Sequence, residues 1–173
     1  PRGRDILPFL SLFQSDPSGG AQDIWAHIHT RGAMGDQTRA GLTRRGIMEG
    51  LFAPDGALCA MADGVGLAAP FSPYMIDWGA TRGMMDEIAP RLPGPPPKRP
   101  LAFPVSNMMV VRGAVAAEMA RYFGTDYPWP NEPMPDDGTV VQLIERLWPL
   151  AARSAGYGAV FVEPHDDVAE DAA

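Results

Sequence analysis

The clearest hydrophobic periodicity lies near the C-terminus, in the stretch DDGTVVQLIERLWP over 136–149. Apolar side chains recur there at helical spacing, at Val140, Leu143, Ile144 and Leu147. One face of the segment is therefore apolar, which is typical of a helix packed on a core. Thr139 is a suitable N-cap residue, and Pro149 is expected to mark the end of the helix.

Shorter patterns divide the rest of the chain into alternating strands and helices. Strands are predicted over 23–30, 64–70, 101–112 and 156–162, and helices over 37–51, 57–62, 81–92 and 113–123. The apolar run ILPFLSLF near the N-terminus fits either a helix or a buried strand, because periodicity cannot separate the two in so short a run. The alternation of the two kinds of element predicts an α/β fold. We expect one domain over 1–165, followed by an acidic tail over 166–173.

Composition limits the classes of function that remain. The chain has 173 residues, 46% of them hydrophobic, which is enough for one domain with a core. A formal net charge of −7 argues against a broad nucleic-acid surface, which would need a basic face. The single cysteine, Cys59, allows no intrachain disulfide and fits a reducing compartment; we expect it to be buried and inert. No apolar run is long enough to span a bilayer, so we expect no transmembrane segment and a cytoplasmic location.

The first candidate site is the acidic pair that precedes the C-terminal helix. Asp136 and Asp137 lie just before Gly138 and Thr139. A carboxylate at a helix N-terminus is stabilised by the helix dipole, which keeps it ionised. One of the two can therefore serve as a catalytic base, and helix capping explains the same placement equally well.

The second candidate site is the segment HIHTR over 27–31. His27 and His29 are two residues apart on a predicted strand, so their rings share one face. Arg31 follows in a predicted loop, and two imidazoles with a guanidinium suit a phosphate or a sugar hydroxyl. A metal site would need a third ligand. The structural alternative is one histidine packed in the core and the other solvated.

Four stretches of the chain, taken in order, resemble the rhamnan synthesis protein F family. In sequence order they are His27-Ile28-His29-Thr30-Arg31, Gly66-Leu67 with Pro70 and Trp78-Gly79, Phe103-Pro104-Val105-Ser106-Asn107-Met108, and Tyr127-Pro128 through Asp137-Gly138-Thr139 to Glu145-Arg146-Leu147-Trp148-Pro149. The resemblance covers about residues 23 to 160. The chain departs from the family pattern at several positions; Arg31 stands where the family has lysine, and Ser106 where it has glycine.

The resemblance implies a glycosyltransferase of bacterial cell-surface polysaccharide synthesis. The implied fold is a GT-A-like mixed sheet flanked by helices. The chain starts at Pro1 and has neither an Asp-x-Asp motif nor a nucleotide-binding strand-helix unit. Either an N-terminal half is missing or the family dispenses with the motif, and we expect the chain to be the C-terminal portion of a larger domain. The resemblance implies Asp137 as the base that deprotonates the acceptor, with Asp136 as the alternative. The expected substrate-binding residues are His27, His29, Thr30, Arg31, Trp78, Phe103, Asn107 and Met108.

The expected partners are a nucleotide-sugar donor and a glycan acceptor, with peripheral association to a membrane-bound polysaccharide assembly. No motif identifies a set of metal ligands, and the sequence leaves open whether a divalent metal ion is a cofactor. Two other functions are compatible with the same residues. One is a non-catalytic carbohydrate-binding or scaffold domain of the same pathway, and the other is a metal-dependent hydrolase that uses His27, His29 and an aspartate.

Overall fold

A computed structural model describes residues 4–15, 20–29, 37–71, 78–95, 98, 102–135 and 138–163. Within these residues the chain forms five α-helices, several short 3-10 helices and one sheet of four strands. The fold is therefore mixed α/β, as the alternation of sequence patterns predicts. No described helix combines the length and the hydrophobicity that crossing a membrane requires.

The sheet is mixed, with the strand order β1-β3-β2-β4. Its strands are β1 (Ile24–His27), β2 (Val65–Pro70), β3 (Met109–Arg112) and β4 (Gly158–Val162). The β1-β3 and β3-β2 pairs are antiparallel, whereas β2 and β4 run parallel. Parallel neighbours require a crossover connection, and α4 and α5 lie in the chain between β3 and β4.

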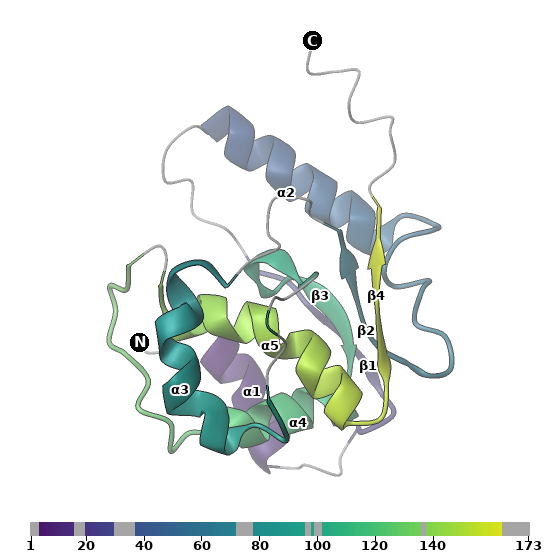
Figure 1. Ribbon diagram of the computed structural model, residues 1–173. Helices are drawn as coiled ribbons and strands as arrows, with labels where there is room; N and C mark the ends of the chain where they lie inside the picture. The colour runs from purple at the N-terminus through teal and green to yellow at the C-terminus, as the bar shows by residue number, and fades with distance from the viewer. Residues whose placement is uncertain are drawn as a thin grey trace.

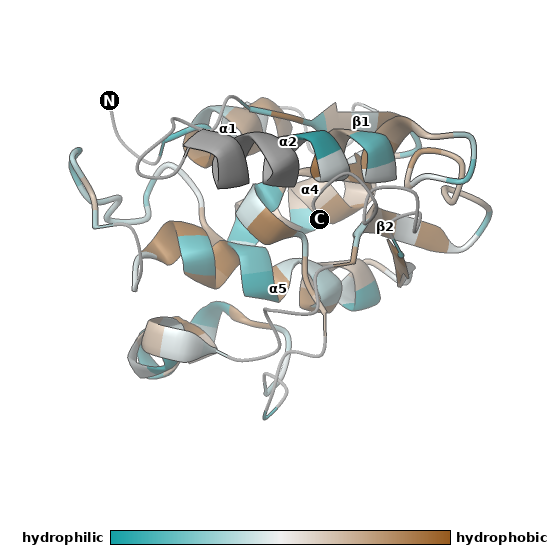
Figure 2. Cartoon of the chain, turned by 90° about the horizontal axis from the view of Figure 1, so that it is seen from above, coloured by the Kyte–Doolittle hydropathy of each residue, from teal (hydrophilic) through white to brown (hydrophobic). Residues whose placement is uncertain are grey.

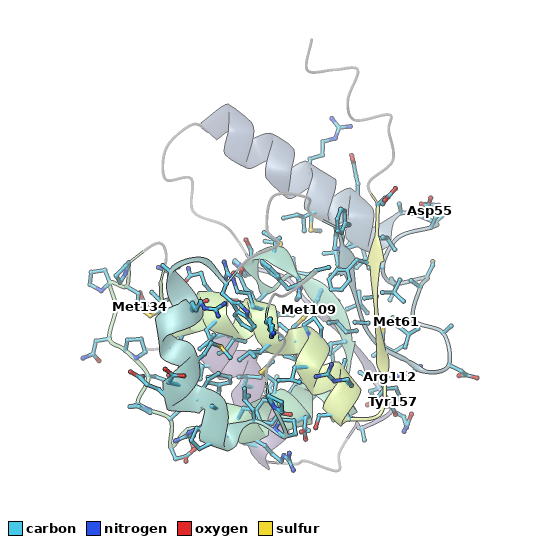
Figure 3. All side chains as sticks on the ribbon, in the orientation of Figure 1. Asp55, Met61, Met109, Arg112, Met134 and Tyr157 are labelled. Atoms are coloured by element: carbon cyan, nitrogen blue, oxygen red, sulfur yellow. The ribbon has the colours of Figure 1, made fainter. Side chains whose placement is uncertain are left out.

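Helices cover the two faces of the sheet unequally (Figure 1). One face carries α1 (Ile6–Ser15), α4 (Gly113–Tyr122) and α5 (Val140–Ser154) over the larger hydrophobic core. The end of α2 (Gln37–Phe52) and the turns after it cover part of the other face with a smaller core. The larger core includes the fully buried Trp148 of α5 and Met109 of β3, and Met109 lies at the centre of the molecule in Figure 3.

Helix α5 has the predicted N-terminus but not the predicted end. Thr139 and Gln142 form a reciprocal capping box, which satisfies backbone donors at the first turn. The helix continues through Pro149 to Ser154, so the prediction that Pro149 ends it is wrong. Apolar side chains on both sides of the proline, Leu147 and Leu150, are buried, and this burial outweighs the lost backbone donor. The helix is banded with hydrophobic and hydrophilic residues in Figure 2.

Three further predictions need correction. Residues 57–60 form turns and residues 61–62 form no regular element, so the predicted helix over 57–62 is absent, and Cys59 within this segment is exposed rather than buried. The predicted helix over 81–92 is instead a 3-10 helix over Gly79–Met84, the single turn α3 (Met85–Ile88) and a second 3-10 turn over Ala89–Arg91. The predicted strand over 101–112 is limited to β3, because a 3-10 turn over Val105–Asn107 precedes it.

Candidate functional site

Four of the predicted site residues lie outside the described part of the chain: Thr30, Arg31, Asp136 and Asp137. The other six are described, and the backbone on both sides of the acidic pair is described as well. The candidate site is therefore built from the histidines of β1, the 3-10 turn before β3 and the residues that flank the start of α5.

The two histidines lie on the helix-covered face at the end of β1, with their ring centroids 6.0 Å apart. Nδ1 of His27 is 2.7 Å from the carbonyl oxygen of Asn107, and Nε2 of His29 is 2.6 Å from that of Ser106. Because a carbonyl oxygen only accepts, each of these ring nitrogens carries the hydrogen and donates it. Neutral His27 therefore carries its lone pair on Nε2.

Asp5, at the start of α1, faces both histidines and was missed at the level of sequence. Its Oδ2 atom lies 3.4 Å from Nε2 of His27 and 3.8 Å from Nε2 of His29. This oxygen is buried, yet it has no hydrogen-bond partner within the described residues. A helix start at Asp5 could be inferred from the apolar run that follows it, but its contact with His27 joins residues far apart in sequence and leaves no local signal.

The environment of His27 favours the neutral ring. Burial lowers the pKa of His27 from its ordinary value; the hydrogen bond with Asn107 and the charge of Asp5 oppose this shift but do not cancel it. The Nε2 lone pair and the Asp5 carboxylate are then two acceptors that face each other. The two atoms are 3.4 Å apart and Oδ2 is buried, so a substrate hydroxyl can reach them only after the side chains move; either atom could then accept its proton.

Asn107 connects the histidines to α5. Its carbonyl accepts from His27, its Nδ2 donates to the carbonyl of Val141, and its Oδ1 accepts from Nε1 of Trp148. Ser106 and Asn107 also have consecutive positive φ angles of 59° and 55°. Non-glycine residues adopt this conformation only when the surrounding contacts hold them there. The turn that positions the two carbonyls is therefore fixed by α5.

The remaining predicted binding residues lie below the surface. Trp78 and Phe103 are each 2% exposed, and Asn107 and Met108 are each 1% exposed. Arg146 of α5 stacks over Phe103, with the guanidinium carbon 4.8 Å from the ring centroid. Trp78 donates from Nε1 to the carbonyl of Lys98. In this structure these side chains pack in the core next to the histidines, and their contact with substrate stays a prediction.

The chain on both sides of the acidic pair contacts this cluster. Arg4, next to Asp5, donates from Nη2 to the carbonyl of Met134 at 3.2 Å and to that of Pro135 at 3.5 Å. The carbonyl of Val141, in the first turn of α5, accepts from Asn107. The described chain before position 136 is thus held by Arg4, which is next to Asp5, and the described chain after position 137 is held by Asn107, which contacts His27.

Within the described residues, no group of three or more histidine, cysteine, aspartate or glutamate side chains is arranged to hold a metal ion. Comparison with known proteins gives no relative: no protein-family model, no curated protein and no solved structure matches the chain. The functional interpretation therefore depends on the residues themselves.

Proposed function

We propose that this chain contributes the acceptor side of a glycosyltransferase, which moves a sugar from a nucleotide-sugar donor to a growing cell-surface polysaccharide. Rhamnose is the sugar that the resemblance implies. One observation carries the proposal. Segments from all four family-like stretches meet at one place. Asn107 contacts His27, Val141 and Trp148. Beside it, the guanidinium of Arg146 lies over the ring of Phe103, and its Nη2 is 3.6 Å from the position that a Cβ atom on Gly79 would take.

The chemistry of the described residues fits the first step of such a transfer. The acceptor hydroxyl must lose a proton as it attacks the anomeric carbon of the donor, and the nucleoside diphosphate departs with the bonding electrons. Asp137, with Asp136 as its alternative, is the proposed base. Asp5 and His27 are the second candidate pair for receiving the hydroxyl proton, once the Asp5 side chain moves to expose Oδ2, which has no hydrogen-bond partner within the described residues.

The test is turnover by the full-length protein with UDP-, GDP- and dTDP-linked sugars, including a rhamnose donor, measured as release of nucleoside diphosphate in the presence of acceptor glycan. Asp137→Asn should lower kcat by about 100-fold or more, the usual range for loss of a general base. The exposed Asp63 provides the matched control, and Asp63→Asn should turn over like the parent.

Two results would change this conclusion. Absence of release from every donor would remove the transferase proposal. Unchanged turnover by Asp137→Asn together with a large loss in Asp5→Asn would move the base to the pair formed by Asp5 and His27.

The second candidate function is a non-catalytic carbohydrate-binding or scaffold domain. The burial of Trp78, Phe103, Asn107 and Met108 favours the scaffold form of this alternative, because these side chains stabilise the fold and offer no exposed surface to a sugar. Calorimetric titration with the acceptor glycan separates the two. Binding that is retained in Asp137→Asn, without turnover of any donor by the parent, would support the scaffold.

A further inference from the structure

Strand β1 forms one edge of the sheet. It pairs with β3 on one side, through the register Ile24 with Arg112 to His27 with Met109. Within the described residues, no strand pairs with its other side. The outward N–H and C=O groups of such an edge are free to bond another strand, and proteins usually block an edge with charge, proline or a bulge. From Ile24 to Ile28 the sequence IWAHI has no proline, lysine or acidic residue.

The row of side chains on the face of β1 away from α1 is apolar and uncovered. Ala26 pairs with Val110, which belongs to the smaller core, so Ile24, Ala26 and Ile28 point to that face. The smaller core contains Val110 and Ala68 of the neighbouring strands but none of these three residues. Ile24 and Ile28 are each 43% exposed, and Ala26 is exposed as well. Figure 2 shows β1 at the margin of the molecule.

We infer that β1 pairs in antiparallel register with β1 of a second copy of this chain, about a twofold axis at Ala26. The side chains are self-complementary in this register. Large Ile24 lies opposite large Ile28, and small Ala26 lies opposite itself, so the apolar row continues across the axis with matched sizes. The pairing also places no acidic residue opposite another, which matters for a chain of net charge −7.

Helix α1 supplies a second apolar contribution on the other face of this edge. Phe13 of α1 packs on Trp25 of β1, with ring centroids 5.3 Å apart. Leu12, next to Phe13, is 56% exposed, the largest value among the large hydrophobic side chains described. Four of the six exposed large hydrophobic side chains within the described residues, namely Leu12, Ile24, Trp25 and Ile28, therefore belong to α1 or the β1 edge. A second copy would remove part of this group from water.

The pairing has a consequence for the histidines. In the register centred on Ala26, Trp25 of each copy lies opposite His27 of the other, on the face that carries Asp5. The aromatic ring then borders the histidine cluster of the second copy. A short edge buries less area than the roughly 1,600 Å² of a standard interface, so the dimer should be weak and form over about 1–100 µM.

A disulfide at the axis tests the register directly. Cross-strand Cα atoms are about 4.5–5.5 Å apart in antiparallel pairs, which lies within the range for a disulfide. Because Cys59 is exposed, the background is Cys59→Ser. In that background, Ala26→Cys should form a covalent dimer under oxidised glutathione at least about tenfold faster than Leu58→Cys, another exposed position far from β1 along the chain. Adding Ile28→Lys to the Ala26→Cys protein should reduce its rate of covalent dimer formation to that of the Leu58→Cys protein.

Sedimentation velocity of the parent from 1 to 200 µM gives the second readout. The parent should shift from monomer to dimer, and Ile28→Lys should stay monomeric with an unchanged circular dichroism spectrum. A parent that stays monomeric throughout, with equal cross-linking at positions 26 and 58, overturns the inference. So does a parental dimer that Ile28→Lys leaves intact, since another surface would then hold it. These outcomes do not depend on glycosyl transfer.

Discussion

Asn107 determines both where His27 is held and how Trp148 is packed. Its backbone carbonyl fixes the imidazole, and its amide side chain satisfies two groups of α5. Its φ of 55° lies in the left-handed region, which asparagine tolerates better than most residues. The sequence predicts Asn107 as a binding residue, because the family-like motif draws attention to it. Its role as a connector could not be predicted, since its partners lie 34, 41 and 80 positions away.

Replacing Asn107 separates its side-chain contribution from its backbone contribution. Asn107→Ala should lower the free energy of unfolding by about 2–4 kcal/mol, because Nε1 of the fully buried Trp148 loses its partner and alanine is strained at positive φ. Asn107→Gly relieves the strain and should cost about 1 kcal/mol less. Urea denaturation of the two variants and the parent measures both differences, and equal costs for the two variants would show that backbone strain contributes little.

The acid-base behaviour of His27 follows from its burial. Because burial lowers its pKa from 6.5 in the folded protein, the unfolded chain takes up the proton more readily. The stabilisation from neutral His27 is complete above about pH 6.5 and is lost as the pH falls through 6.5 toward the lower folded value. The His27 ring proton in an NMR titration should therefore have its midpoint below 6.5. The charge of Asp5 opposes the shift, so Asp5→Asn should move the midpoint lower still; a midpoint at or above 6.5 would contradict the assignment.

At the scale of elements, hydrophobic periodicity predicts those segments whose burial pattern is regular. The strands β2 and β4 and the helices α2 and α4 lie within or close to their predicted ranges. The errors occur where tertiary packing overrides local preference. Pro149 is tolerated inside α5 because buried leucines surround it, and the alanine-rich 57–60 segment is held in turns by backbone bonds such as that from the amide of Ala57 to the carbonyl of Gly50.

The start of α5 is the element feature that the sequence predicts best. Thr139 forms the expected cap, and its reciprocal bond with Gln142 completes the capping box. Thr139→Ala should lower the free energy of unfolding by about 1 kcal/mol, because an orphan backbone donor loses its partner. The exposed Thr125 is a matched control, and Thr125→Ala should change stability by less than about 0.5 kcal/mol. Thermal denaturation of both variants provides the comparison, and equal effects would argue that the cap is replaced by water.

At the scale of the whole molecule, Arg112 joins three parts of the chain. Its guanidinium donates to the carbonyls of Val65, Gln22 and Ala62, and it lies over the ring of Tyr157 at 5.6 Å. Figure 3 shows Arg112 and Tyr157 side by side at one end of the sheet. The start of β1, the start of β2 and the segment before β4 are thus held together by one side chain.

Arg112→Lys keeps the charge but loses the planar fork that reaches three carbonyls at once. We expect it to lower the free energy of unfolding by about 1.5–3 kcal/mol, measured by urea denaturation. Arg153, exposed in the last turn of α5, is the control, and Arg153→Lys should be neutral within about 0.5 kcal/mol. If Arg112→Lys lowered the free energy of unfolding no more than Arg153→Lys does, water would be shown to replace the guanidinium at the three carbonyls.

Because Asn107 contacts both His27 and Trp148, it limits which substitutions this protein can accept. A change in hydrocarbon packing around Trp148 would tilt the amide, and the tilt would reach the imidazole of His27 through the same residue. Substitutions in the core around Trp148 are therefore expected to change the position of the His27 ring as well. Attempts to redesign the cluster should begin from variants that leave the indole untouched.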